Sequence, residues 1–408
     1  MKGKQIIYFI LLLFVTVIGL WGIPELVKTA AYSRNQYPFV YFSSVEKKFL
    51  LREFDSSKSK FHDDEGKEFT EEQYDIALPL LNYRQLTVNG EMPDSIGDRA
   101  IDPRELRVKM VNFRYQPAET HSSGTDLYIM YESLPKKAKL ESPGDVFRLN
   151  EQIQFIDDET NRINEPKSEL FRDALLKKGF TFPAQWTYGN LNIRKAYDEG
   201  YFSLDAAGQL YHIKMVNGRP FVKNTKLDSS IEPAYFSMLE VSDKRFYGFL
   251  FDKRGNVFIL EEGGGKYVPV QLEIDPISLD NDEFAIIGNM FYWTVSVQNQ
   301  SGKKYYALDN ETLHKQREIY LEASANKWDT VASYLFPAYL TFKSRKSDYI
   351  SPRLHLTAYT ALICNLILAI LMVFLFPAES LREKIFAGIY ALIFGIAGTL
   401  ALLIIPNK

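Results

Sequence analysis

The chain contains almost no cysteine: the single one among its 408 residues, Cys364, lies inside a long apolar run near the C-terminus. The large central part can therefore form no disulfide framework and no cysteine-based metal site. A domain without cysteine tolerates an oxidising compartment, which is compatible with export. Basic residues are not in excess either, because the net charge is −3 and the pI is near 6.1. This balance lacks the electrostatic footprint of a nucleic-acid-binding protein, so no nucleic-acid partner is expected.

Signatures of enzymatic catalysis are also missing. The sequence has no Gly-x-Ser-x-Gly elbow of a serine hydrolase. Residues 263–266 (GGGK) lack the spacing and the Ser or Thr of a phosphate-binding loop, so we predict a hairpin tip there. Ser57 and Lys60 match the Ser-x-x-Lys spacing of an acyl-serine site, but their polar surroundings predict a solvated loop. We therefore expect no catalytic residue.

Metal-binding patterns are equally absent from the sequence. The five histidines lie too far apart for the ligand spacing of a zinc site, and we expect them to be structural or solvated: His62, His121, His212, His314 and His355. The acidic stretches 63–65, 157–159 and 280–283 do not follow the calcium-loop pattern and are expected to form solvated turns. The sequence thus predicts no metal and no cofactor.

Three long apolar runs contrast with this ordinary composition, at 6–22, 356–376 and 385–405. Each is long enough, or nearly so, to cross about 30 Å of hydrocarbon as a helix. We therefore divide the chain into a transmembrane anchor, an exported β domain, an interfacial or juxtamembrane segment and a transmembrane helical hairpin, at 1–24, 35–327, 328–354 and 355–406.

The distribution of positive charge predicts the orientation. Lys2 and Lys4 precede the first apolar run, which favours a cytoplasmic N-terminus and a central domain in the periplasm. Arg382 and Lys384 then lie in a cytoplasmic loop. The basic residues at 343–353 oppose this orientation, but charges on large translocated domains have less influence. The basic start also fits a cleaved secretory signal, although an uncleaved anchor is favoured because small residues follow the apolar run late.

A weak internal repeat with a period of 47 residues occupies the central part. A four-residue turn recurs at 158–161, 205–208, 252–255 and 299–302. Its first position is Asp or Asn, which can accept hydrogen bonds from its own backbone, and its last position suits a positive φ. These end positions are Asp158 and Asn161, Asp205 and Gly208, Asp252 and Gly255, and Asn299 and Gly302.

Aromatic and β-branched runs flank each turn, such as YGFLFD before and NVFILEE after the third, and predict antiparallel hairpins. A second glycine turn at 217–218 also recurs 47 residues later at 264–265. Two hairpins make the four strands of a propeller blade, so the fold class is mainly β: a propeller-like array of four-stranded repeats of about 47 residues. The alternative is an irregular β-rich domain with chance periodicity. The first copy departs from the pattern, because a helix is predicted from Pro166 to Lys178.

Small residues recur at every fourth position in both C-terminal runs. The first stripe is Thr357, Ala361, Asn365 and Ala369, and the second is Ala387, Ala391, Gly395 and Thr399. Such stripes let helix backbones approach closely in a membrane. They either dock another membrane subunit or face each other within the hairpin. The segment 328–342 is too short to span, and its aromatic residues with the basic cluster after it indicate an interfacial segment, a closing strand or a buried helix.

The layout of the whole chain resembles an uncharacterised bacterial family with an N-terminal anchor, an exported β-rich domain and a C-terminal membrane hairpin. The resemblance lies in the start MKGKQIIYFILLLF, the Asp-x-x-Gly turns and the hairpin loop PAESLREK. It implies an inner-membrane protein of gut-type anaerobes that accompanies the ATPase and permease of an ABC transporter. Because the chain has no nucleotide-binding motif, it would be an accessory subunit.

Three functions follow as expectations. The first is a non-catalytic accessory or sensor subunit of an inner-membrane transport complex, with a permease-type integral-membrane partner. The second is a membrane-anchored hydrolase or lyase that acts on envelope glycans in a central propeller channel. The third is a ligand sensor that signals through its spans to another chain. Fold alone does not choose among them.

Overall fold

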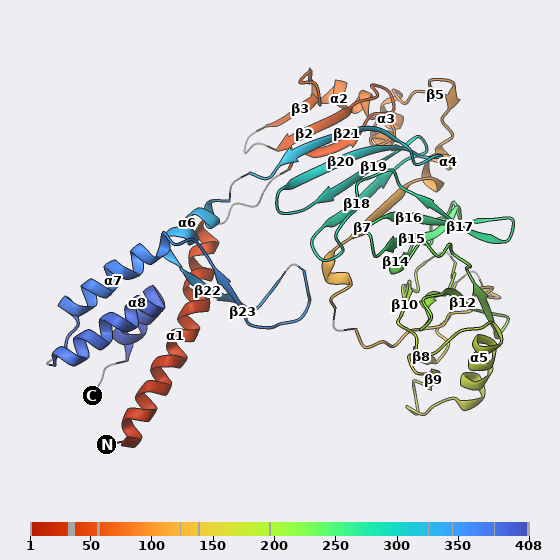
Figure 1. Cartoon of the computed structure of the whole chain (residues 1–408). Coiled ribbons are helices and arrows are strands. Elements are labelled where there is room, and N and C mark those ends of the chain that lie inside the picture. The colour runs from red at the N-terminus through yellow and green to blue at the C-terminus, as the bar shows by residue number, and fades with distance from the viewer. Residues whose placement is uncertain are drawn as a thin grey trace. The chain divides into compact units, whose positions relative to one another are not determined.

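The structure is a computed structural model that describes residues 2–31, 37–54, 58–122, 124–137, 139–195, 197–324, 326–344, 346–378 and 380–405. It consists of two compact units. One comprises residues 37–322, and the other combines residues 1–36 with 323–408. Figure 1 shows the elements of both. Each unit has its own buried core and is described separately.

The large unit is mainly β and consists of many small antiparallel sheets. Its first part forms one four-stranded sheet in the order β1-β2-β3-β4, followed by short elements. The elements are β1 (Phe39–Phe42), β2 (Phe49–Phe54), β3 (Ser59–Asp63), β4 (Glu68–Phe69), α2 (Glu71–Ala77), α3 (Tyr83–Asn89), β5 (Ser95–Ile96), β6 (Arg99–Ala100), α4 (Pro103–Val108), β7 (Val111–Tyr115) and the short 3-10 helix η1 (Pro117–Glu119).

The 47-residue repeat forms three consecutive antiparallel sheets, in which each strand pairs with the next along the chain. The first contains β10 (Trp186–Gly189), β11 (Tyr201–Leu204), β12 (Leu210–Val216) and β13 (Arg219–Asn224). The second contains β14 (Pro233–Met238), β15 (Phe246–Asp252), β16 (Val257–Gly263) and β17 (Lys266–Gln271). The third contains β18 (Glu283–Gly288), β19 (Tyr292–Gln298), β20 (Gly302–Asp309) and β21 (Lys315–Glu322), and β7 joins it as a fifth strand beside β18.

The first copy of the repeat is not a four-stranded sheet. It has only the hairpin of β8 (Asp145–Leu149) and β9 (Ile153–Asp157), and α5 (Glu165–Lys177) follows in place of further strands. The predicted helix is thus confirmed. In this copy Asp157, rather than the exposed Asp158, accepts the hydrogen bond from the Thr160 N–H, at 2.8 Å.

The repeated turns are closed by their acidic side chains. The buried carboxylate of Asp252 accepts the backbone N–H groups of Arg254 and Asn256 at 2.9 and 2.8 Å, and Asp205 accepts that of Gln209 at 2.7 Å. Gly208 and Gly255 have φ of 76° and 88°, as the turn pattern predicts. Gly302 differs: it begins β20, and glycine is required there because a Cβ would lie 2.5 Å from the Leu321 carbonyl oxygen.

We expect Asp252→Ala to lower the free energy of unfolding by about 1.5–3 kcal/mol, because it removes a charged acceptor from backbone donors inside the unit. Asn299→Ala changes the equivalent but exposed turn of the next sheet, where water can replace the lost bonds, and should cost about 1 kcal/mol or less. Denaturant unfolding of the detergent-solubilised protein, followed by tryptophan fluorescence, measures both. Equal losses would contradict the structural role of the buried turn.

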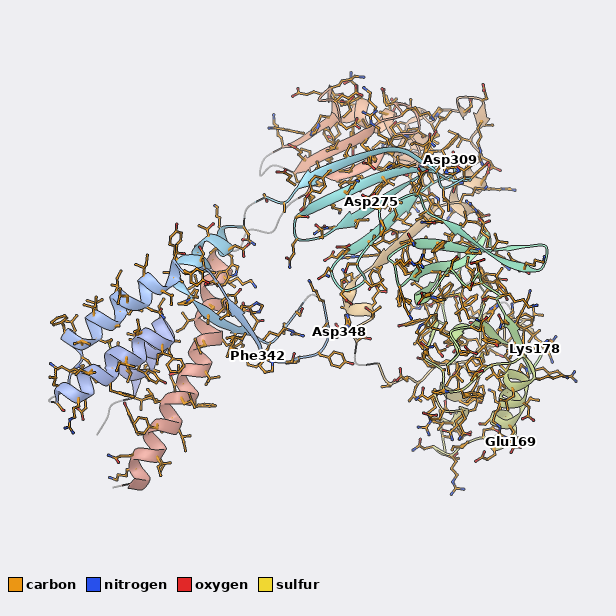
Figure 2. The ribbon with its side chains drawn as sticks, viewed as in Figure 1. Glu169, Lys178, Asp275, Asp309, Phe342 and Asp348 are labelled. Atoms are coloured by element: carbon orange, nitrogen blue, oxygen red, sulfur yellow. The ribbon has the colours of Figure 1, made fainter. Side chains whose placement is uncertain are left out.

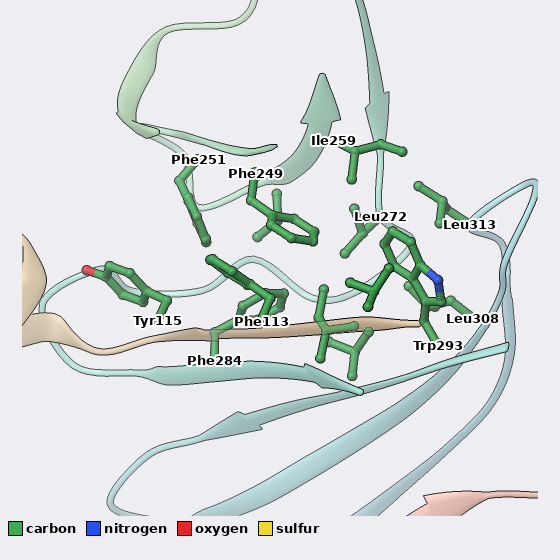
Figure 3. Close-up of a cluster of buried hydrophobic side chains, with 14 of the residues drawn as sticks. Phe113, Tyr115, Phe249, Phe251, Ile259, Leu272, Phe284, Trp293, Leu308 and Leu313 are labelled. Carbon is green, nitrogen blue, oxygen red and sulfur yellow. The ribbon is translucent and has the colours of Figure 1, made fainter. Parts of the chain in front are cut away.

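Apolar cores join neighbouring sheets in a row. On β15, Phe249 and Phe251 face the five-stranded sheet, where Phe113 stacks on Phe249 with ring centroids 4.2 Å apart (Figure 3). The intervening Leu250 belongs to the core shared with the β10–β13 sheet. This central strand is buried on both faces, which explains why its sequence is a nearly continuous apolar run.

The same packing continues at both ends of the row. The β1–β4 sheet packs on the five-stranded sheet through Phe42, Phe49 and Tyr305. At the other end, the β8–β9 hairpin and α5 pack on the β10–β13 sheet through Phe147 and Phe171. The described residues form no closed propeller. Residues 37–140 contribute one four-stranded sheet, the two-stranded β5–β6 sheet and β7, rather than the two blades for which their length has room.

The small unit contains α1 (Lys2–Ala31), α6 (Lys327–Leu335), β22 (Ala338–Thr341), β23 (Arg353–Leu356), α7 (Ala361–Leu375) and α8 (Leu381–Ile404). Helix α8 packs against both α1 and α7. Two helical segments, Gly3–Ala31 and Leu381–Ile404, are long and apolar enough to cross a membrane. The run predicted as a span at 356–376 is helical only from Ala361 to Leu375. Its first residue, Leu356, is the last residue of β23. The 15 residues of α7 reach about 22 Å at 1.5 Å per residue, less than the hydrocarbon thickness.

Candidate functional site

The structure shows where several of the motifs singled out in the sequence lie. In the part of the chain that the structure describes, no three His, Cys, Asp or Glu side chains gather closely enough to hold a metal ion. Ser57 lies outside the described residues. Gly263 pairs with Lys266 across the β16–β17 hairpin, which confirms the predicted hairpin tip. The acidic stretch at 63–65 is not fully solvated, because Asp63 and Asp64 are buried against Lys48 and Arg317.

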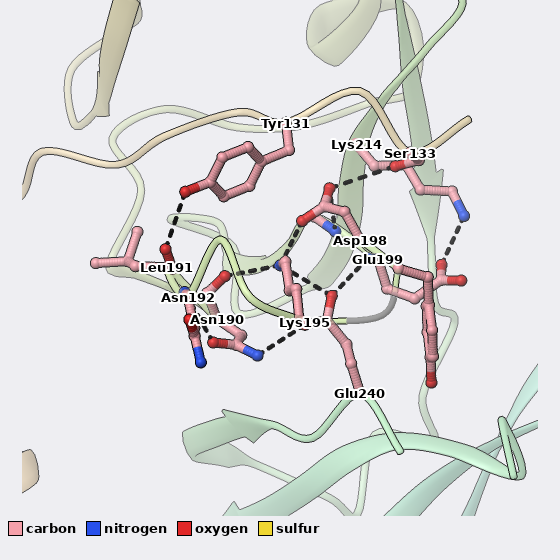
Figure 4. Close-up of polar contacts among 12 residues, drawn as sticks. Tyr131, Ser133, Asn190, Leu191, Asn192, Lys195, Asp198, Glu199, Lys214 and Glu240 are labelled. Atoms are coloured by element: carbon pink, nitrogen blue, oxygen red, sulfur yellow. Dashed lines mark hydrogen bonds and ion pairs between the residues drawn. The ribbon is translucent and has the colours of Figure 1, made fainter. Parts of the chain in front are cut away.

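A group of three ion-paired, buried side chains lies elsewhere, in two loops of the large unit (Figure 4). Lys195 is in the loop between β10 and β11, together with Asp198, and Glu240 is in the loop between β14 and β15. Their side chains are 3%, 1% and 1% exposed. The Lys195 ammonium forms ion pairs with the Asp198 carboxylate and, at 3.0 Å, with the Glu240 carboxylate. It also donates to the Asn190 carbonyl oxygen at 2.7 Å.

Backbone and amide donors also bind the carboxylates of this cluster. The Glu240 carboxylate accepts the Glu199 N–H at 2.7 Å and the Asn190 side-chain amide at 2.8 Å. The Asp198 carboxylate accepts the Gly200 N–H at 3.1 Å. Because donors from one loop bind an acceptor in the other, the cluster fixes the β10–β11 loop to the β14–β15 loop. We call Lys195, Asp198 and Glu240 the ion cluster.

The ion cluster has two carboxylates for one ammonium. Burial raises the pKa of both the Asp198 and the Glu240 carboxyl groups, and the nearby Lys195 opposes this rise. Taking charges out of water in this way is costly unless they are paired and hydrogen-bonded. All three side chains are paired, so none is free to bind or transform a substrate in this arrangement. The cluster is suited to hold the loop, rather than to perform chemistry.

A second polar layer lies beside the ion cluster. The fully buried His212 ring contacts the Tyr267 hydroxyl at 2.7 Å and the Glu199 carbonyl oxygen at 2.5 Å. The carbonyl can only accept, so Nε2 carries the proton and Nδ1 accepts from the tyrosine. Burial lowers the pKa of His212 to about 3, which keeps the ring neutral. Lys214 completes this layer by donating to the Glu199 carboxylate at 2.6 Å.

The ion cluster holds a loop that exposes apolar side chains. Leu191 and Ile193 are 48% and 46% exposed. The loop is further fixed by the Tyr131 hydroxyl, which donates to the Leu191 carbonyl oxygen at 3.0 Å, and by the Asn192 side chain, which accepts the Arg194 N–H at 3.0 Å. A rigid loop that presents apolar and basic side chains loses little entropy on binding, which favours recognition of another molecule.

The structure places the predicted small-residue stripes mostly between α7 and α8. Five residues of the stripes are buried there with Asn365 and Thr399: Ala361, Ala369, Ala387, Ala391 and Gly395. Thr357 instead precedes α7, and its hydroxyl donates to the Phe336 carbonyl oxygen. Neighbouring stripes therefore meet within this hairpin, one of the two arrangements that the sequence allows.

Helix α8 is interrupted at Gly395, whose φ and ψ are 55° and −136°. Side chains replace helical bonds around this break: Asn365 donates to the Leu392 carbonyl oxygen and Thr399 to that of Gly395, both at 2.9 Å. The Asn365 side-chain oxygen is buried and has no hydrogen-bond partner among the described residues. The side-chain nitrogen of Asn365 thus has a hydrogen-bond acceptor in α8, whereas its oxygen has no donor among the described residues.

These observations define a class: a mainly β protein whose small stacked antiparallel sheets are joined in one chain to long apolar helices. The chain belongs to the family named "Domain of unknown function (DUF4857)", whose pattern matches residues 39–308. The matched region lies within the large unit. This agrees with the uncharacterised family expected from the sequence layout.

No curated protein matches the chain. Two solved structures share 9% sequence identity with it. One is PorZ of Porphyromonas gingivalis, described as an essential bacterial surface component of the type-IX secretion system, with a TM-score of 0.21 and coverage of 73% of this chain and 33% of PorZ. The other is a post-proline cleaving enzyme from Rickettsia typhi, with a TM-score of 0.20 and coverage of 82% and 53%. The chain thus spans about a third and about half of their lengths.

Proposed function

We propose that this protein is a non-catalytic accessory or sensor subunit of a bacterial inner-membrane complex related to transport. The large unit acts as its recognition platform. The ion cluster is the observation that supports this proposal: its buried, paired charges hold a loop that presents Leu191 and Ile193 to solvent. A binding loop needs such rigidity, whereas a catalytic lysine or carboxylate would need access to a substrate.

The small unit supports a membrane location. Helices α1 and α8 have the length and composition of membrane spans. We propose that α7 is a third, short span, that the protein is a multi-pass protein of the inner membrane, and that the large unit lies in the periplasm. Helix α7 exposes a row of large apolar side chains, including Leu362, Leu366 and Ile370. A permease-type integral-membrane protein is the partner that would cover this row.

The stacked sheets support a propeller-like platform that is open rather than closed. Each of the three full repeats has the four antiparallel strands of a blade. The alternative function, a hydrolase or lyase acting on envelope glycans, requires a closed channel lined by accessible polar groups. The described residues provide no observation that favours it, so we do not propose it.

Site-specific photo-crosslinking tests the platform. We expect a crosslinker at Leu191 or Ile193, in the full-length protein in its native membrane, to capture one stoichiometric partner identified by mass spectrometry. A crosslinker at Val268, an exposed apolar residue of β17, is the matched control and should capture none. Equal capture at all three positions, or at none, would contradict recognition through this loop.

A second experiment tests whether the helical hairpin binds a membrane partner. A variant that lacks residues 356–408 should retain a folded large unit, as judged by circular dichroism, but lose co-purification with an ATPase and permease in mild detergent. Retained co-purification would contradict the role of the helical hairpin. A protein that purifies alone in both forms would contradict the accessory-subunit proposal.

A further inference from the structure

The hairpin of β22 and β23 in the small unit has two chemically different faces. On β23, Arg353 and His355 turn toward the unit: the Arg353 guanidinium donates to the Phe342 carbonyl oxygen at 3.2 Å, and His355 lies 2.8 Å from the Thr341 hydroxyl. The alternate residues Leu354 and Leu356 are 62% and 77% exposed. A two-stranded hairpin is marginally stable in water, and this one presents an apolar face to solvent.

The hairpin packs beside the C-terminal part of α1 through aromatic side chains. The Trp21 ring of α1 meets the Phe342 ring edge to face, with centroids 5.4 Å apart. Tyr339 of β22 packs in the same way on Trp328 of α6, at 5.5 Å. Trp328 belongs to a buried cluster that also contacts Ile23. Tryptophan and tyrosine concentrate at membrane–water interfaces, where one part of the ring is buried and the other hydrated.

The loop that joins β22 to β23 carries positive charge. Residues 343–353 contain four basic residues and one acidic residue, Asp348. Figure 2 shows Phe342 and Asp348 on this segment. The exposed side chains of Ile350 and Tyr359 add apolar surface on either side of β23. Basic residues next to exposed apolar ones are typical of segments that bind the surface of anionic membranes.

We propose that the β22–β23 hairpin and its described flanking residues, 338–344 and 346–360, bind the lipid surface of the membrane directly. Leu354 and Leu356 enter the boundary between headgroups and acyl chains, and Lys343 contacts anionic phospholipid headgroups. The lipid surface is the occupant because the hairpin is attached to α1 beside exposed apolar side chains of that helix, such as Phe14 and Ile18, which lipid would also cover. The inference rests on the proposed membrane location of α1 and α8.

Depth measurements test the proposal in the full-length protein. Leu354→Cys and Leu356→Cys are prepared in a Cys364→Ser background, labelled with a fluorescent probe and placed in nanodiscs. Acyl-chain nitroxide lipids and aqueous iodide are the two quenchers. Ile10→Cys, an exposed position of α1, is the membrane control, and Val268→Cys of the large unit is the aqueous control. We expect the two hairpin positions to be quenched by the lipids and protected from iodide, as Ile10 is.

Each other outcome overturns the proposal for a distinct reason. If the hairpin positions behave like Val268 while Ile10 is quenched by lipid, the hairpin does not bind the membrane although α1 does. If Ile10 is also quenched by iodide, the membrane location itself fails. If the hairpin positions are protected from both quenchers, protein covers them instead of lipid.

The headgroup contact has its own test. Phosphatidylglycerol added to phosphatidylcholine nanodiscs should increase lipid quenching at Leu354, and Lys343→Gln should reduce this increase roughly fivefold, the equivalent of about 1 kcal/mol for one lysine near an anionic surface. Lys266→Gln, at the hairpin tip of the large unit, is the control and should change nothing. An increase that is the same in all three proteins would overturn the anionic contact.

Discussion

Lys195→Met should lower the free energy of unfolding of the large unit by about 3–5 kcal/mol, the typical cost of removing one partner from a buried ion pair. Methionine fills a similar volume, so the loss arises from electrostatics rather than from a cavity. It leaves the Asp198 and Glu240 carboxylates buried without their cation. Denaturant unfolding in mild detergent, followed by the fluorescence of Trp186 and Trp293, measures the loss.

The loss should depend on pH in a defined direction. Burial already raises the pKa of both carboxyl groups in the native protein, and removal of Lys195 raises it further. A carboxyl group whose pKa is higher in the folded than in the unfolded state binds its proton more tightly when folded. Its contribution to stability is therefore greatest in acid and is lost as pH rises from about 4, the unfolded value, through the raised folded value. The variant should approach the parent protein in acid and fall furthest below it at neutral pH.

Lys214→Met provides the matched control. Lys214 pairs with Glu199, but both side chains are partly exposed, so water can solvate the remaining carboxylate. Its loss should cost about 1 kcal/mol or less. If both variants lose the same amount, or if the deficit of Lys195→Met does not shrink in acid, the ion cluster does not stabilise the loop as described.

Gly395→Ala should destabilise the helical hairpin by about 2–6 kcal/mol. The backbone at Gly395 adopts a conformation that other residues rarely accept, with a strain of about 1–3 kcal/mol. The added Cβ would also lie 2.3 Å from the Asn365 side-chain oxygen, and such overpacking costs about 1–3 kcal/mol. Hydrogen exchange of the α8 amides in nanodiscs should report faster opening in the variant.

Gly22→Ala is the control for this substitution. Gly22 also lies in an apolar helix, α1, but a Cβ there meets nothing within 4 Å. Alanine should be neutral or stabilise the helix by up to about 1 kcal/mol. If Gly395→Ala exchanges as slowly as the parent protein, α8 does not need glycine at this position, and the break is not a stable feature of the helix.

The local parts of this fold were predictable from the sequence. The turns at Asp205 and Asp252 are closed by residues within four positions along the chain, so their pattern carries the information. The capping box of Thr70 and Gln73 at the start of α2 is equally local, because its two residues lie three positions apart. The sequence predicts a helix for the whole apolar run from Leu356, although Leu356 belongs to β23, because hydropathy does not distinguish an exposed strand from a span.

The non-local parts were not predictable. Glu240 meets Lys195 across 45 residues, and no spacing rule connects an acidic residue of one hairpin loop with a lysine of another. Pairing of β7 with β18 likewise depends on a register set by distant strands, such as Phe113 opposite Ile286. Whether repeated sheets close into a propeller depends on their number and their ends, and here an α-helix replaces the strands of one copy.

The order in which the sheets pack has a consequence for biosynthesis. The Phe42 N–H donates to the Thr294 hydroxyl, a residue 252 positions later, and β7 pairs with β18. The earliest strands to leave the ribosome or a translocation channel therefore acquire their neighbours only when the last sheet has emerged. Until then their apolar faces and open edges are exposed to self-association. Nascent chains interrupted before β21 should accordingly depend on chaperones. Truncated chains that end within the third repeat should also leave the early strands β1 and β7 unfolded, because those strands lack their partners.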